Sequence, residues 1–155
     1  NGHQGQALPS FGVERRGAPV KAVVRIADEQ IRIHSQSVEP DILVLMDSNL
    51  LPVALAGGMK DGGDVKIICN GTAGLDCDYP CYMVDAAAIA TEAGLLSPDG
   101  PFINVPMFGA CCKVLDIPED VVAATIRERW HGAAAEKNLK GALGAYHAVA
   151  LTGGK

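Results

Sequence analysis

The sequence predicts an α/β fold, a Rossmann-like open sheet of mostly parallel strands with flanking helices. Residues 42–46 (ILVLM) form an unbroken apolar run, which is typical of a strand buried on both faces of a parallel sheet. Further short apolar runs alternate with helical patterns, and this alternation indicates βαβ units with right-handed crossovers. Aromatic residues make up only 5% of the chain. The core must therefore rest on aliphatic side chains, which suits α/β layers better than a β-sandwich.

The first half of the chain reads as strands around one short helix. Strands are predicted at residues 21–26, 42–46, 65–69 and 81–85, with a continuation or edge piece at 30–35. A helix is predicted at residues 49–59. It should end at Gly57-Gly58 or Gly62-Gly63, because glycine favours helix C-termini.

The second half reads as helical. Asp85 should cap a helix over residues 86–93, with Gly94 just past its end. A helix is expected to start near Asn104, and another at Pro118, which two acidic residues follow. The last helix is predicted at about residues 133–149, and the final residues, TGGK, read as a tail. His131 is expected in the last turn of the helix that begins at Pro118.

Composition limits the classes of function. A chain of 155 residues is predicted to form a single domain, residues 1–155. Its net charge of −5 argues against a nucleic-acid partner. No apolar run approaches the roughly 20 residues that a membrane span needs, and no signal peptide is visible. With no export signal, five cysteines are best read as reduced thiols in the cytoplasm.

Arg15, Arg16 and Gly17 are the first candidate site. Two guanidinium groups on a glycine turn suit bidentate recognition of phosphate or carboxylate, and glycine allows close backbone approach. The alternative is that the arginines are solvated or pair with Glu14. Asn104, the second candidate, is expected at a helix N-cap and at a strand's carboxyl end, where open α/β sheets bind ligands. A plain capping role is the alternative.

No catalytic or metal-binding motif is visible. The cysteine spacings lack the CxxC pairs of structural zinc sites, and the four histidines are scattered. The predicted strands and helices place four of the cysteines where free thiols behave as small hydrophobes. There is no GxSxG, no complete GxGxxG and no P-loop. The chain taken alone therefore lacks recognisable catalytic machinery and metal ligands.

The segment QALPSFGVERRGAPVKAVVRIADEQI resembles the γ subunit, or γ-type domain, of the 2-oxoacid:ferredoxin oxidoreductases, the family of pyruvate:ferredoxin oxidoreductase. The resemblance continues through DILVLMDSNLL, VDAAAIATEAG, FINVPMFGACCKVLDIPEDVV and NLKGALGAYHAV. These segments cover nearly the whole chain in the family's order. One departure is that the family's first strand and Gly-rich turn are absent ahead of Gln6, so the fold is expected to lack its first strand–helix unit.

The resemblance implies a subunit without a catalytic cofactor of its own. Such enzymes decarboxylate a 2-oxoacid oxidatively, acylate coenzyme A and reduce ferredoxin. Thiamine diphosphate, Mg²⁺ and [4Fe-4S] clusters are expected in the α, β and ferredoxin-like subunits. By this resemblance the γ part is expected to cover the thiamine site and to help hold coenzyme A. Arg15 and Arg16 match the family's basic pair and Asn104 its strand-end Asn, and with Gly17 these residues are the expected coenzyme A contacts. The alternatives are a structural assembly module and a stand-alone nucleotide-binding domain.

Overall fold

The chain divides after Glu39 into two units, Asn1–Glu39 and Pro40–Lys155. The structure is a computed structural model that describes residues 3–10, 20–33, 35, 39–57 and 65–153.

The first unit is built on an antiparallel hairpin of β1 (Gln4–Pro9) and β2 (Ala22–Ala27). The Arg25 guanidinium on β2 donates to the Gln6 side chain across the hairpin at 2.9 Å, and also to the backbone carbonyl of Ser35. The predicted strand over residues 21–26 is confirmed with a shift of one residue. The edge piece expected at 30–35 is wrong for residues 30–33 and 35, which form no strand.

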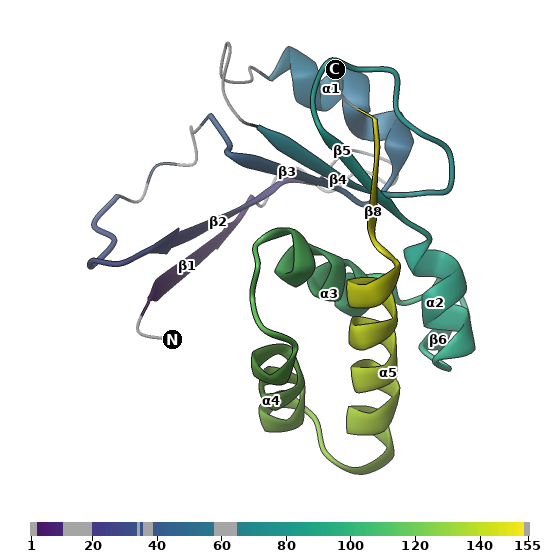
Figure 1. Ribbon diagram of the computed structural model, residues 1–155. Coiled ribbons are helices and arrows are strands. Elements are labelled where there is room, and N and C mark those ends of the chain that lie inside the picture. The colour runs from purple at the N-terminus through teal and green to yellow at the C-terminus, as the bar shows by residue number, and fades with distance from the viewer. Residues whose placement is uncertain (1–2, 11–19, 34, 36–38, 58–64, 154–155) are drawn as a thin grey trace. The chain divides into compact units, whose positions relative to one another are not determined.

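The described strands of the second unit form a sheet in the order β3 (Ile42–Leu45), β4 (Lys66–Asn70), β5 (Cys81–Val84) and β8 (Ala150–Gly153). The first three run parallel, which confirms the predicted Rossmann-like α/β architecture (Figure 1). The prediction of a C-terminal tail is wrong for Thr152 and Gly153, because β8 pairs antiparallel with β5. That pairing uses backbone groups, so the side chains of these two residues do not signal it.

Helices cover both faces of this sheet (Figure 1). Successive side chains of β4 point to opposite faces. Ile68 packs in a cluster with α3 and α5, whereas Ile67 and Cys69 pack in a second cluster with Leu51 of α1. The expectation that the strand at 42–46 is buried on both faces is wrong, since Val44 is 38% exposed. The reason is position: β3 is the last described strand at its end of the sheet.

In the part of the chain that the structure describes, six helical segments follow the predicted pattern closely. They are η1 (Ser48–Leu50), α1 (Leu51–Ala56), α2 (Ala86–Glu92), α3 (Asn104–Val114), α4 (Glu119–Arg129) and α5 (Gly132–Ala148). A small hairpin, β6 (Leu96–Ser97) with β7 (Gly100–Pro101), lies between α2 and α3 and was not predicted. Gly94 follows α2 at φ +71°, a left-handed conformation that glycine adopts without strain.

His131 differs from its predicted place. Helix α4 ends at Arg129, and His131 is extended, with φ −127° and ψ 159°, as the N-cap residue of α5. The helix stops early because Trp130 is already in the extended region. His131 therefore stands at the positive end of a helix dipole, so the predicted favourable charge at a C-terminus is wrong.

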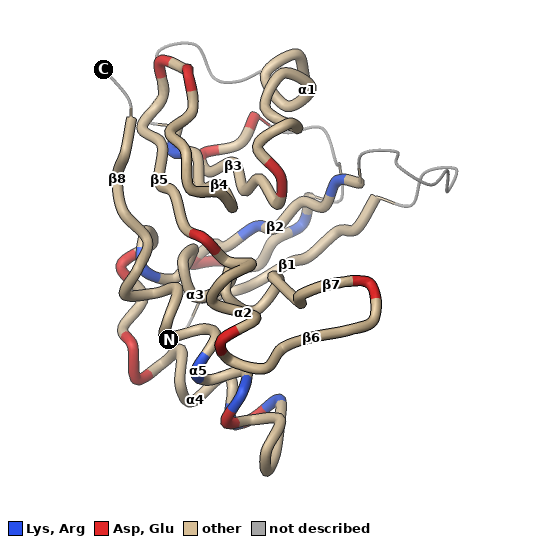
Figure 2. The backbone as a smooth tube through the Cα atoms, turned by 90° about the vertical axis from the view of Figure 1, so that its right-hand side faces the viewer, with Lys and Arg blue, Asp and Glu red and all other residues tan. Residues whose placement is uncertain are grey.

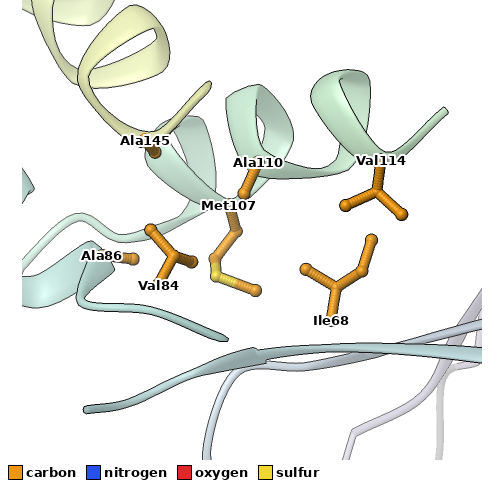
Figure 3. Close-up of a cluster of buried hydrophobic side chains, with 7 residues drawn as sticks. All are labelled: Ile68, Val84, Ala86, Met107, Ala110, Val114 and Ala145. Carbon is orange, nitrogen blue, oxygen red and sulfur yellow. The ribbon is translucent and has the colours of Figure 1, made fainter. Parts of the chain in front are cut away.

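Helix α3 is the central helix of the second unit. Met107 and Val114 point from α3 toward Ile68 and Val84 of the sheet (Figure 3). On another side of α3, Cys112 packs with Val122 and Ile126 of α4 and with Ala142 of α5. Val122 and Ile126, four residues apart on α4, are each 1% exposed. This packing holds the N-terminus of α3, and with it Asn104, in a fixed position.

Candidate functional site

Polar side chains stand where the parallel strands end. Asp47 follows β3, Asn70 ends β4 and Asp85 follows β5. A carboxylate oxygen of Asp47 accepts from the backbone N–H of Asn49, and one of Asp85 accepts from that of Ala88, both at 2.9 Å. The predicted cap at Asp85 is confirmed. Both carboxylates satisfy helix N-terminal donors, so their described bonds are structural.

Asn70 joins three elements at this edge of the sheet. Its side-chain N–H donates to the Met46 carbonyl after β3 at 3.1 Å, and its side-chain oxygen accepts from the backbone N–H of Ala86 at 3.0 Å. The amide therefore ties the end of β3 to the start of α2. Sequence reasoning missed this residue. A polar residue at the end of an apolar strand was the available signal.

Asn104 is exposed and is the first residue of α3, not its N-cap. The N-cap is Ile103, whose φ of −83° and ψ of −10° are already helical and whose carbonyl accepts from Met107 at 2.9 Å. No side chain caps this helix. Asn104 also follows the small β6–β7 hairpin, so it does not follow a strand of the four-stranded sheet directly. The predicted capping role is therefore wrong, and the amide of Asn104 projects from the first turn.

Asn104 lines a pocket of about 310 Å³. Its apolar wall comes from the segment around the β6–β7 hairpin, the first turn of α3 and the residue after α4, and comprises Leu95, Leu96, Phe102, Val105 and Trp130. Lys137 and Asn138 of α5 add polar groups. The side-chain N–H of Asn138 donates to the Ala134 carbonyl at 2.8 Å, which holds that buried amide in place. The pocket thus combines apolar side chains, an ammonium group and the first turn of a helix, features that suit an apolar group carrying negative charge.

Arg15, Arg16 and Gly17 lie outside the described residues. They belong to the first unit and Asn104 to the second. The structure therefore does not test whether these positions meet, and their grouping stays a prediction.

The described cysteines are thiols, and four of them are held in their protonated form by burial. Burial, with a smaller contribution from Cys112, raises the pKa of Cys111 to about 12. Burial raises the pKa of Cys112 to about 11 and also raises the pKa of Cys69, to which Asp47 adds. Protonated thiols are poor nucleophiles and poor metal ligands. The interpretation of these cysteines as core residues agrees with their environment.

Helices α4 and α5 of the second unit carry charges of both signs. Lys and Arg are interspersed with Asp and Glu on α4 and α5 (Figure 2). Within the described residues, no three His, Cys, Asp or Glu side chains lie together as a metal site would require. No described helix is both long enough and apolar enough to cross a membrane.

A profile of the pyruvate ferredoxin/flavodoxin oxidoreductase family matches residues 1–148. The chain belongs to this family. The match confirms the resemblance seen in the sequence, and it includes Arg15, Arg16, Gly17 and Asn104.

Two curated members of the pyruvate ferredoxin/flavodoxin oxidoreductase family show how similar the chain is to named subunits. The common γ subunit of pyruvate/ketoisovalerate oxidoreductases from Thermococcus kodakarensis is 39% identical, over 92% of this chain and 79% of that subunit. Pyruvate synthase subunit PorC from Methanocaldococcus jannaschii is also 39% identical, over 92% of this chain and 78% of PorC. The first is named as a subunit of oxidoreductases and the second as a subunit of pyruvate synthase.

The fold matches a solved member of the family as well. The crystal structure of pyruvate oxidoreductase subunit PORC from Thermotoga maritima superposes with a TM-score of 0.76 at 25% identity. The match covers 96% of this chain and 82% of that subunit. The α/β architecture described above is thus that of an oxidoreductase subunit.

Proposed function

We propose that this chain is the γ subunit of a multi-subunit 2-oxoacid:ferredoxin oxidoreductase of the pyruvate synthase type. The single observation that carries the proposal is the family match over residues 1–148, with relatives named as γ or PorC subunits. Residues 1–155 act as one γ-type domain in the cytoplasm, beside α, β and ferredoxin-like subunits. The complex passes electrons to ferredoxin, and this chain has no activity by itself.

The catalytic cofactors of the complex belong to the other subunits. Thiamine diphosphate supplies decarboxylation chemistry, Mg²⁺ anchors its diphosphate and [4Fe-4S] clusters carry electrons. The described residues do not fit a metal ion or an iron–sulfur cluster, since no three His, Cys, Asp or Glu side chains among them lie together and their buried thiols are protonated. The γ subunit instead covers the thiamine site and binds the acyl acceptor.

Coenzyme A is the ligand that we assign to this chain, through Arg15, Arg16, Gly17 and Asn104. The residues in the second unit fit part of such a ligand. The exposed amide of Asn104 and the Lys137 ammonium line one pocket with Phe102 and Trp130, so a phosphate and a flat ring could both find partners there. Arg15 and Arg16 would supply bidentate contacts to the remaining phosphates, and Gly17 would let the backbone approach them.

Arg16→Ala in the assembled enzyme tests this assignment. The variant should raise the apparent KM for coenzyme A about 10- to 150-fold, since a hydrogen bond to a charged group contributes about 1.5–3 kcal/mol. The KM for the 2-oxoacid and the rate of its decarboxylation should stay within about twofold of the parent, because the thiamine site lies in other subunits. Steady-state kinetics with each substrate varied in turn gives these constants.

Arg127→Ala is the matched control, because it removes an exposed arginine of α4 that lies away from the pocket lining. It should leave the KM for coenzyme A unchanged. An unchanged KM in Arg16→Ala as well would remove Arg16 from the coenzyme site.

Exposed apolar side chains favour a second candidate, an assembly module without a ligand of its own. Leu96 and Phe102 at the small hairpin are both more than half exposed, and such residues are typical of subunit contacts. In that case Arg15 and Arg16 pair with carboxylates of a neighbouring subunit. Arg16→Ala would then reduce the yield of co-purified subunits and leave the KM for coenzyme A unchanged.

A further inference from the structure

The loop over residues 71–80 connects two adjacent parallel strands, β4 and β5, without a helix. Near its end it carries Cys77, and β5 opens with Cys81 four residues later. The two Sγ atoms are 2.9 Å apart. A disulfide bond is about 2.05 Å long, so the sulfur atoms need to approach by only about 0.9 Å to form one.

The surroundings of the pair hold both sulfur atoms in place. The thiol of Cys81 donates to the Tyr79 carbonyl at 3.1 Å, and that of Cys77 faces the same oxygen at 3.8 Å. Both cysteines pack in the cluster that includes Leu51 and Cys69. Cys81 is fully buried and Cys77 is half-buried. Cys77 is therefore the more accessible residue of the pair, and Cys81 is shielded from solvent.

The geometry points to a modification site: Cys77 and Cys81 form a reversible disulfide that closes the end of the β4–β5 loop onto the first residue of β5. This inference does not rest on the proposed function, because it concerns a pair of side chains that are not among the residues assigned to coenzyme A.

The reaction is thiol–disulfide exchange with a small-molecule disulfide, RSSR. The Cys77 thiolate attacks one sulfur of RSSR, so that a bond forms between Cys77 and SR and the first RS⁻ leaves. The Cys81 thiol gives its proton to the first RS⁻ and attacks Cys77 Sγ as a thiolate, which displaces the second RS⁻. The two cysteines lose two protons and two electrons, and RSSR gains them as two molecules of RSH.

The order of these steps follows from burial. Burial first, and then the hydrogen bond with Cys77, raise the pKa of Cys81 to about 12. Cys81 is thus protonated at neutral pH, and a buried thiol is a poor target for an oxidant in solution. The half-buried Cys77 meets RSSR first. The second step needs no encounter in solution, because the two sulfur atoms are already neighbours.

Formation of the Cys77–Cys81 disulfide should restrain the β4–β5 loop and add little to the stability of the fold. The ring spans only residues 77–81, so it removes little entropy from the unfolded chain. It does fix the loop against the edge of the sheet where β8 pairs with β5. Cys81 is the register partner of Gly153, and the register shifts between Cys81 and Tyr82. The disulfide therefore restrains the end of the β5–β8 pair at which the register shifts.

The test uses the full-length protein that carries this chain, reduced with dithiothreitol, desalted and exposed to glutathione disulfide. Remaining thiols are blocked with N-ethylmaleimide in denaturant, and an endoproteinase that cleaves before aspartate separates the two cysteines at Asp78. Most wild-type chains should give the peptide 76–77 joined to 78–84 and free of the label. Dithiothreitol should release both peptides in a form that can be labelled.

Cys77→Ser should yield no joined peptide and should leave Cys81 labelled. Cys111→Ser removes another half-buried thiol and should leave the joined peptide at its wild-type yield. Three results would overturn the inference. They are both cysteines fully labelled, a stable glutathione adduct on Cys77 beside a labelled Cys81, and a disulfide from either cysteine to Cys69.

Discussion

Gly109→Ala is expected to destabilise the chain by about 3 kcal/mol or more, through overpacking of two helices. A Cβ atom on Gly109 would stand 1.9 Å from the carbonyl oxygen of Ala142 and 2.7 Å from its carbonyl carbon. These are backbone atoms of α5, so one helix must move away from the other. Helix propensity alone would make alanine more stable than glycine by about 1 kcal/mol. The predicted change in the free energy of unfolding therefore has the opposite sign to the one that helix propensity gives. Urea unfolding followed by circular dichroism measures the change.

Gly144→Ala is the matched control, also a helical glycine of this unit. Its Cβ would meet only Cγ2 of Ile89, at 3.1 Å, and that side chain can give way. The gain in helix propensity should offset the contact, so its stability should stay within about 1 kcal/mol of the parent. Equal stability of the two variants would show that α3 and α5 do not approach as closely as described.

Ile68→Ala should cost about 2–5 kcal/mol, the range for a large-to-small change in a closed core. Ile68 is 0% exposed in the cluster with Met107 and Val114, which pack onto it from α3 (Figure 3). Its removal opens a cavity beneath the helix that carries Asn104. Thermal or urea unfolding of the purified chain gives the loss in the free energy of unfolding.

Val44→Ala provides the comparison within the same sheet, because Val44 is the register partner of Ile68 on β3. At 38% exposed it should cost only about 1 kcal/mol, since part of the surface of the removed methyl groups is already in water. If the two variants lose the same stability, β3 is covered in solution and Ile68 is not the more deeply buried residue.

The sequence predicts best those elements whose own residues carry the signal. The apolar runs of β4 and β5, the acid-rich start of α4 and the cap at Asp85 depend on local pattern, and all are found. Strands β1 and β8 were missed because Gln4–Pro9 and Ala150–Gly153 owe their conformation to a partner strand. Secondary structure that is stabilised by tertiary pairing leaves little trace in its own residues.

In the candidate site, too, features signalled by local sequence were predicted and features that depend on tertiary packing were missed. Asn104 was singled out by sequence, but its capping role failed because the helical turn begins at Ile103. The pocket beside it depends on Trp130 and Lys137, which lie 26 and 33 residues further along the chain and reach it only through the packing of α4 and α5. Asn70 was missed for the same reason, because its two hydrogen bonds join elements that meet only in the folded chain. The assignment of Arg15, Arg16 and Gly17 stays a prediction.

The central claim, that this chain is a γ subunit, is tested most directly by the proteins that co-purify with it. An affinity tag on the full-length protein, purified without oxygen from its own cells, should recover further subunits in constant proportion. The complex should show the broad absorbance of iron–sulfur clusters and release thiamine diphosphate on denaturation. A tagged protein that elutes alone, with neither the absorbance nor the cofactor, would contradict the account.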